Sequence, residues 1–196
     1  MSGTASSKNA PAARHPVLAN PVDTGLVVID VQERFARAIP GFDRIVRTIA
    51  ALIRGFGQYS LPIVVTEQYP RGLGHTVPRI AECLQAPERV EKITFSAMQE
   101  PRFADRVEAL GAGSFVVCGI EAHVCVHQTV CDMLHAGYRI WVPWDAVGSR
   151  DPRNRILAMG RMAQAGAIPT SAEMLLFEMA GRAGTDSFKN IQSWLR

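Results

Sequence analysis

The sequence lacks a long apolar run, a strong net charge of either sign and closely paired cysteines. No apolar run approaches the roughly 18 residues that a membrane-spanning helix requires, so no membrane partner is expected. The formal net charge is only +3, and the basic residues are scattered along the chain. This charge does not favour nucleic acid as a partner either.

Cysteine is scarce and unpaired. None of the four cysteines forms the C-x-x-C pair typical of metal and redox sites. A chain of 196 residues that is 47% hydrophobic can bury a sizeable core, so it has no need of disulfides. We therefore expect a reducing, cytoplasmic location. The four cysteines are Cys83, Cys118, Cys125 and Cys131.

Residues 1–20 differ in composition from the rest of the chain. They are small and polar, include proline, and contain no apolar segment of the kind that signal peptides carry. This composition is typical of a mobile tail, with a transit peptide as the alternative. Residues 21–196 are predicted to form a single domain.

Apolar runs alternate with helical patterns along this domain. Short β-branched or apolar runs predict six strands, at residues 25–30, 61–66, 90–95, 114–118, 138–142 and 167–170. Helical spacing predicts helices at residues 42–56, 76–84, 103–110, 124–136, 152–163, from 171 onward and at 186–195. The alternation predicts an α/β fold: a doubly wound, mainly parallel six-stranded sheet with helices on both faces.

The stretch at residues 116–136 combines a strand, a short crossing and a helix. The crossing ends at Cys125, which should lie at or just inside a helix N-terminus. Unpaired N–H groups and the helix dipole stabilise a thiolate there, which favours a nucleophile. The alternative is a buried cysteine that acts only as a small apolar residue.

Two charged residues also lie at or near the carboxyl ends of predicted strands, where α/β sheets place their ligand sites. Asp30 ends the first strand, and Lys92 lies in the third. Asp30 could accept the proton of a thiol as a general base, or could merely cap a turn. Lys92 could lower the pKa of the thiol, or could be a solvated residue of an edge strand.

Three blocks carry these residues in order: G-L-V-V-I-D-V-Q with Asp30, K-I-T-F-S-A-M with Lys92, and C-G-I-E-A-H-V-C-V with Cys125. With them, the chain resembles the isochorismatase-like cysteine hydrolase family from about residue 24 to the C-terminus. The resemblance implies the Rossmann-like fold of that family and a triad of Asp30, Lys92 and Cys125. It also implies a cis peptide between Ile120 and Glu121, and an oxyanion hole formed by the backbone N–H groups of Glu121 and Cys125.

The sequence departs from one branch of the family. Nicotinamidases carry an Asp-x-His metal motif after the second strand, whereas this chain has T-E-Q-Y-P-R-G-L-G and a lone His75. We therefore expect neither a metal nor another cofactor. The segments around residues 66–74 and 119–122 look closest to the isochorismatase domain-containing branch. The family also leads us to expect a homo-oligomer.

Together these features predict a cysteine hydrolase that acts on a small amide-like C–N bond through a thioester intermediate. Phe35, Tyr69 and His123 are predicted to line the pocket for the small-molecule substrate, or else are ordinary packing or surface residues. Two other functions stay open: a catalytically silent binding or scaffold protein of the same fold, and a thiol redox sensor.

The pKa of Cys125 separates it from the other cysteines. The helix N-terminus and Lys92 should lower this pKa below the roughly 8.5 of a free thiol, while an ionised Asp30 opposes them. Cys125 is therefore expected to react first with an alkylating agent near neutral pH.

Overall fold

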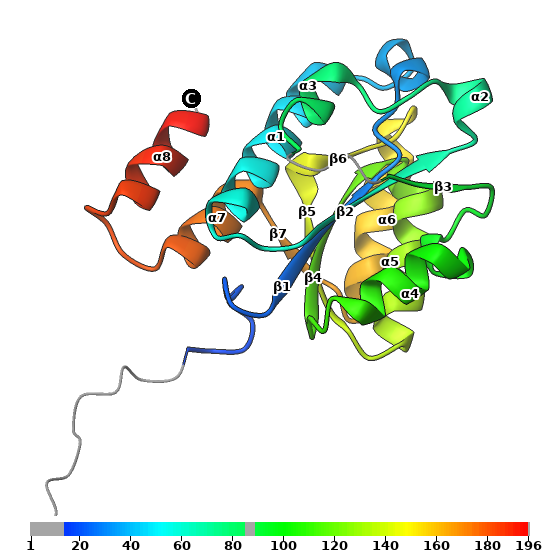
Figure 1. The fold of residues 1–196 in the computed structure, drawn as a ribbon. Helices are drawn as coiled ribbons and strands as arrows, with labels where there is room; N and C mark the ends of the chain where they lie inside the picture. Colours follow the sequence, from blue (N-terminus) through cyan, green and yellow to red (C-terminus); the bar gives the residue numbers. More distant parts are fainter. Residues whose placement is uncertain (1–13, 85–88, 196) are drawn as a thin grey trace, which may run out of the picture.

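The computed structural model describes residues 14–84 and 89–195, and it shows a parallel sheet between two layers of helices (Figure 1). The strand order is β3-β2-β1-β4-β5-β7, and β6 pairs with β4. All six strand pairings are parallel. The strands are β1 (Thr24–Ile29), β2 (Ile63–Gln68), β3 (Arg89–Lys92), β4 (Ser114–Ile120), β5 (Arg139–Pro143), β6 (Val147–Gly148) and β7 (Ile168–Thr170).

The predicted fold class is confirmed, with one addition. Each of the six predicted strands is present, and β6 is a further strand of only two residues. The chain order reverses between β1 and β4, because β2 and β3 lie on one side of β1 and the later strands on the other. This is the switch point at which doubly wound sheets bind ligands.

Helices cover both faces of the sheet (Figure 1). One layer contains α1 (Phe42–Gln58), α3 (Pro78–Ala81), α7 (Ala172–Ala180) and α8 (Asp186–Trp194). The other contains α4 (Pro101–Ala109), α5 (His127–His135) and α6 (Pro152–Gln164). Short helical turns lie in the loops: η1 (Glu33–Arg37), α2 (Pro70–Leu73), η2 (Ala97–Gln99), a π-helical turn (Ala122–Val126) and η4 (Trp144–Ala146).

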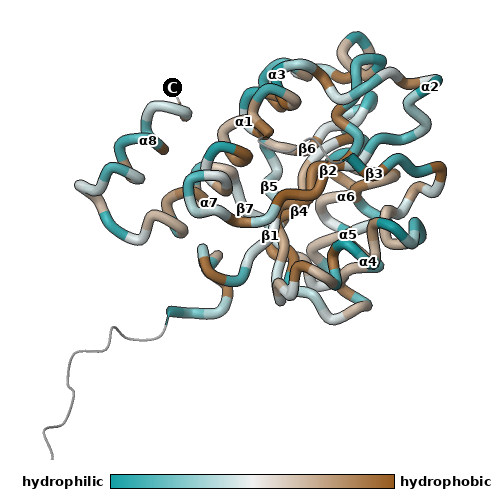
Figure 2. Tube along the Cα trace, in the orientation of Figure 1, coloured by the Kyte–Doolittle hydropathy of each residue, from teal (hydrophilic) through white to brown (hydrophobic). Residues whose placement is uncertain are grey.

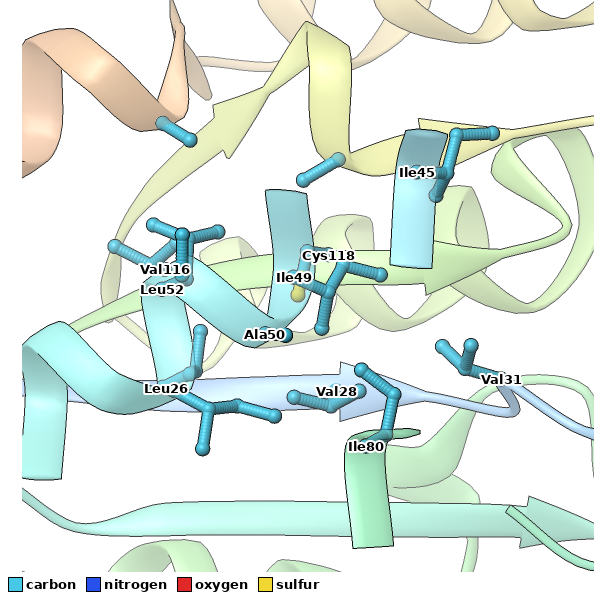
Figure 3. Packing of buried hydrophobic residues seen from close by; sticks show 14 of the residues in the cluster. Leu26, Val28, Val31, Ile45, Ile49, Ala50, Leu52, Ile80, Val116 and Cys118 are labelled. Carbon is cyan, nitrogen blue, oxygen red and sulfur yellow. The ribbon is translucent and has the colours of Figure 1, made fainter. Parts of the chain in front are cut away.

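The core follows from the alternation of side chains along the central strands. Leu26 and Val28 of β1 face the layer of α1, whereas Val27 and Ile29 face the layer of α5. Figure 3 shows Leu26 and Val28 beside residues of α1 and β4, and Figure 2 shows the sheet as an apolar centre among more polar helices. Because both faces are covered, β1 has no polar alternation, as its sequence indicated.

Part of the expected N-terminal tail packs on the domain. The carbonyl oxygen of Val17 accepts a 2.7 Å hydrogen bond from the indole of Trp141, and Ala19 is fully buried. The backbone N–H of Ala19 also donates to Glu178 at 2.8 Å. Residues 17–19 therefore pack against the domain, although the sequence predicted a mobile tail up to residue 20. Residues 1–13 of the expected tail lie outside the described residues.

Gly119 of β4 pairs with Ile29 of β1 and lies directly against its backbone. Its φ of +123° is a conformation that residues with a side chain rarely adopt. A Cβ at this position would collide with the backbone of Ile29, which cannot move without disturbing β1.

We expect Gly119→Ala to lower the free energy of unfolding by at least about 2 kcal/mol, because φ strain and backbone overlap add. Gly57→Ala is the matched control, since Gly57 lies in α1 with nothing near the added methyl group. The control should stabilise by about 0.5–1 kcal/mol. Denaturant unfolding of both variants measures the difference, and equal midpoints would contradict the account.

Candidate active site

Asp30 follows the last residue of β1 and is fully buried. Its φ of +50° is unusual for a residue other than glycine, and such conformations cluster at functional sites. The hydroxyl of Thr66, on the neighbouring strand β2, donates to Oδ1 of Asp30 at 2.6 Å. The carboxylate therefore has a fixed orientation at the carboxyl end of the central strands.

Lys92 ends the edge strand β3, yet its side chain is not in water. Its exposed fraction is 2%, and Nζ lies 2.7 Å from Oδ2 of Asp30 and 2.7 Å from Oε1 of Gln68. The carbonyl oxygens of Thr94 and Phe95 lie 3.2 and 3.3 Å from the same nitrogen. The interpretation of Lys92 as a solvated residue is therefore wrong, because the loop after β3 folds over the ammonium group.

Cys125 lies in the π-helical turn, which continues directly into α5. It is almost fully buried, with an exposed fraction of 7%. The charges of both Asp30 and Lys92 act on its thiol. The structure therefore brings together the three residues that the strand ends indicated.

The turn before Cys125 begins at Glu121. The peptide bond between Ile120 and Glu121 is cis. The carbonyl oxygen of Glu121 accepts hydrogen bonds from the backbone of Val124 at 3.1 Å and of Val126 at 3.2 Å. Its carboxylate accepts two more from Arg150. Hydrogen bonds thus hold both the backbone and the side chain of Glu121 in place just before the π-helical turn.

The expected low pKa of Cys125 is wrong. The pKa of this thiol is raised to about 12, chiefly by burial and then by the charge of the Asp30 carboxylate, while the charge of Lys92 opposes both. Desolvation of the thiolate is the largest of these effects, and the helix N-terminus does not compensate for it. Cys125 is therefore a neutral thiol until a base removes its proton.

This protonation state predicts the alkylation behaviour of the free protein. Near neutral pH, iodoacetamide should label Cys125 more slowly than the half-buried Cys83. The rate at Cys125 should rise about tenfold per pH unit across the neutral and mildly alkaline range, since only the thiolate reacts. Peptide mass spectrometry over time measures both rates. A plateau near neutral pH, with Cys125 labelled first, would show a low pKa instead.

A cavity of about 330 Å³ opens at Cys125. Phe35, one of the three predicted pocket residues, lines it. Tyr69, the residue before α2, lines a separate depression beside Lys92. His123 lines another cavity beside α6 and pairs with the hydroxyl of Ser149 at 3.0 Å. The expectation that these two line the Cys125 cavity is therefore wrong. The other residues of the Cys125 cavity are Arg34, Ala38, Gln68, Leu73, Phe95, Glu121, Val124 and Arg150.

Two glutamines that the sequence did not single out support Lys92. Gln68 accepts the hydrogen bond from Lys92 and also lines the cavity. The fully buried Gln32 accepts from the backbone N–H of Gln68 at 2.8 Å and donates to its carbonyl at 3.0 Å. Gln32 also donates to the carbonyl of Gly74 at 2.7 Å. Their positions, two residues after Asp30 and Thr66 at adjacent strand ends, were the available signal.

The polar side chains at the end of β2 and in the loop after it pair with one another. Glu67 accepts hydrogen bonds from the backbone and hydroxyl of Thr76 at 2.7 and 2.6 Å, and it pairs with His75 at 3.0 Å. Burial raises the pKa of Glu67. The net shift is nevertheless downward, because hydrogen bonds from Thr76 and His75 and the charge of Arg89 stabilise the carboxylate. Residues 14–84 and 89–195 contain no group of three His, Cys, Asp or Glu side chains placed to hold a metal.

Over the same residues, no helix is both long and apolar enough to cross a membrane.

Comparison with known proteins extends the resemblance over most of the chain. The family model described as Isochorismatase domain matches residues 24–174. Isochorismatase domain-containing protein 2 of Xenopus laevis is 36% identical over 169 residues, which cover 85% of this chain and 80% of the relative.

Solved structures agree with this match. The MAR1 ribonuclease of Caenorhabditis elegans is 40% identical, with a TM-score of 0.84 over 91% of this chain and 92% of that one. The YcaC protein of Escherichia coli, described as an octameric hydrolase of unknown specificity, shares the fold at 21% identity. Its TM-score is 0.82 over 93% of this chain and 89% of that one. The chain therefore belongs to the isochorismatase family and has the fold of its hydrolases.

Proposed function

We propose that this protein is a cysteine hydrolase that cleaves a small amide-like C–N bond with Cys125, Asp30 and Lys92. The observation that supports it best is the buried pair of Asp30 and Lys92, joined at 2.7 Å, whose charges act on a thiol at the wall of a small cavity. A buried ion pair beside a buried thiol has a high desolvation cost, and such arrangements are typical of active sites.

The reaction proceeds in two halves. Asp30 takes the proton of Cys125, and the sulfur attacks the acyl carbon to form a tetrahedral intermediate. The backbone N–H groups of Glu121 and Cys125 form the oxyanion hole. Asp30 returns the proton to the leaving nitrogen, so that ammonia or an amine departs and a thioester remains. Water then attacks the thioester, and release of the acid restores the thiol.

The raised pKa of Cys125 fits this role for Asp30. A thiol that ionises only near pH 12 needs a base beside it, and the charge of the Asp30 carboxylate acts on this thiol. Lys92 faces the same carboxylate and stabilises the negative charge as it moves between oxygen and sulfur. The thiolate is therefore formed during the attack and not before substrate binds.

Activity should not depend on a metal ion. Gln68 donates to a backbone carbonyl and accepts from Lys92, and Glu67 and His75 pair with each other, so these polar groups at the end of β2 and in the loop after it have protein partners. Turnover should be unchanged after EDTA treatment and dialysis. Elemental analysis that finds stoichiometric zinc or iron, lost together with activity, would contradict this expectation.

A screen of small amides, ureides and carbamates tests the proposed function, with release of ammonia or amine as the readout. The hydrolase proposal predicts turnover by the wild type and none by Cys125→Ser. Ligand binding without turnover, unchanged in Cys125→Ser, would favour a silent binding protein. A peroxide-induced disulfide between Cys125 and Cys118 or Cys131 would favour a redox sensor.

The name of the Caenorhabditis elegans relative makes ribonuclease the second candidate function. Thioester chemistry acts on acyl carbon and not on phosphodiesters, so the site favours amides. Incubation with single-stranded RNA should give no cleavage beyond that of Cys125→Ser. Cleavage that is lost in Cys125→Ser would favour the ribonuclease.

A homo-oligomer is also part of the proposal. The structure leaves large apolar side chains exposed on α6, with Ile156 71% and Leu157 65% accessible. Light scattering of the purified protein measures the oligomeric state, and a monomer at all concentrations would contradict it.

A further inference from the structure

The loop that folds over Lys92 is tied to the helix that follows Cys125. This loop comprises residues 93–99, and its carbonyl oxygens at Thr94 and Phe95 lie 3.2 and 3.3 Å from Nζ of Lys92. It ends in η2, which packs against α5. The segments that carry Lys92 and Cys125 therefore have a second contact besides the site itself.

Thr129 of α5 forms the central link between these segments. The backbone N–H of Ala97 donates to the Thr129 hydroxyl at 2.9 Å, and this hydroxyl donates to the carbonyl oxygen of Cys125 at 2.7 Å. Thr129 and Ala97 are both fully buried, and hydrogen bonds in such surroundings are stronger than in water. One hydroxyl thus joins the loop over Lys92 to the backbone of Cys125.

Asp132 of the same helix adds a second link. Its Oδ2 accepts hydrogen bonds from the hydroxyl of Ser96 at 2.6 Å and from the side-chain amide of Gln99 at 3.1 Å. Within the loop, the hydroxyl of Thr94 donates to the carbonyl of Ser96 at 2.9 Å. Because Gln99 is exposed, water competes for the link through Asp132, and the link through Thr129 is the better shielded of the two.

We propose that Thr129 is a positioning residue that holds Cys125 at a fixed distance from Lys92 through this loop. Because Thr129 is fully buried, it acts through Cys125 and does not touch the substrate. The role rests on the proposed function, in which Asp30 and Lys92 act on the thiol. A displacement of reacting groups by about 1 Å can lower a rate by about 10²-fold, so the link matters for turnover more than for substrate binding.

Two substitutions at Thr129 and one control test this role. Thr129→Val removes the hydroxyl and keeps the shape of the side chain, whereas Thr129→Ser keeps the hydroxyl. Thr24→Val is the matched control, because Thr24 is also buried and its hydroxyl bonds to the carbonyl of Asn20 at 2.7 Å and to Ser114 at 3.0 Å. Thr24 is the first residue of β1, at the opposite end of that strand from Asp30. The control therefore measures the loss of a buried hydroxyl away from the site.

Thr129→Val should lower kcat about tenfold or more and leave KM within about twofold of wild type, because positioning affects the reaction step and not binding. Thr129→Ser should restore most of kcat, and Thr24→Val should keep it. Steady-state kinetics on an amide found in the screen give both constants. Equal losses of kcat in Thr129→Val and Thr24→Val, or no rescue by Thr129→Ser, would overturn the proposal.

Cysteine labelling tests the same role without turnover. Cys118 is fully buried in β4, so its reaction with iodoacetamide at fixed pH measures opening of the whole domain. In Thr129→Val, the labelling rate of Cys125 relative to Cys118 should rise about threefold or more, because only the turn around Cys125 is loosened. In Thr24→Val this ratio should stay at the wild-type value. An unchanged ratio in Thr129→Val would overturn the proposal.

A further variant covers the case in which Thr129→Val does not fold. Ser96→Ala removes the bond of the loop to Asp132 and leaves Thr129 in place, so it should raise the same labelling ratio by a smaller factor. No rise in this variant would then refute the link.

The two proposals fail in different ways. If the wild type turns over no amide but the labelling ratio rises as expected, the hydrolase proposal fails and the link stands. If amides are hydrolysed and Thr129→Val keeps wild-type kcat, the hydrolase stands and the positioning role does not.

Discussion

Cys125→Ser should reduce the turnover of amide substrates by about 10⁴-fold or more, because the variant loses its nucleophile. A serine hydroxyl is a poorer acid and a poorer nucleophile than a thiol, and Asp30 is a weak base for it. The substitution replaces one atom at a site with 7% exposure, so the fold should persist. Turnover measured under saturating substrate gives the loss.

Cys131→Ser is the matched control for this variant. Cys131 lies in α5, further along the helix that follows Cys125, and its thiol lies 3.7 Å from the ring of His127. Its substitution should leave turnover within about twofold of wild type, since surface and half-buried changes away from the site have small effects. Comparable turnover in the two serine variants would exclude Cys125 as the nucleophile.

Lys92→Met should lower both turnover and stability. Methionine keeps much of the length of the side chain but leaves the carboxylate of Asp30 buried without its counter-charge. Removal of one partner of a buried ion pair destabilises a protein by about 3–5 kcal/mol. Turnover should fall by about 10²-fold or more, because the base and the developing thiolate lose their nearest positive charge.

The double variant Asp30→Asn with Lys92→Met separates these two effects. It removes both charges, so it should recover part of the free energy of unfolding that Lys92→Met loses. It should not recover turnover, because the amide that replaces the carboxylate could not act as a base; the pair is needed for the chemistry and not for the fold. Near-normal turnover in Lys92→Met would refute the role of Lys92.

The sheet was predictable from sequence because both of its faces are covered. Full coverage makes the central strands continuous apolar runs, as in Leu26–Ile29 and Phe115–Cys118, and such runs are distinctive. The two-residue strand β6 has no such signal, because pairing with β4 alone defines it. The short α2 was hidden because its four residues lie within a loop of turn residues.

The candidate site was predictable only in part. Strand ends located Asp30, Lys92 and Cys125, but the pattern around Lys92 could not show that the carbonyls of Thr94 and Phe95 fold over it. Burial of this kind depends on a loop conformation. The pKa of Cys125 was mispredicted for a related reason, since the desolvation that raises it comes from the surrounding fold.

The residues of the cavity were the least predictable. Phe35, Arg34 and Ala38 come from η1 or its end, and Arg150 and Phe95 come from two further loops. No periodicity links these segments, because the cavity is formed by loops that meet only in the folded chain. Tyr69 and His123 are polar aromatic residues near the motifs in sequence, but in the folded chain each lines another cavity.

Covalent catalysis by Cys125 can be observed directly as an acyl-enzyme. Wild-type protein is quenched in acid during turnover of an amide found in the screen, and its peptides are examined by mass spectrometry. The account predicts the mass of the acyl group on the peptide that contains Cys125, released by hydroxylamine and absent in Cys125→Ser. Turnover with no adduct after rapid quenching, or an adduct on Cys83 or Cys131 instead, would contradict it.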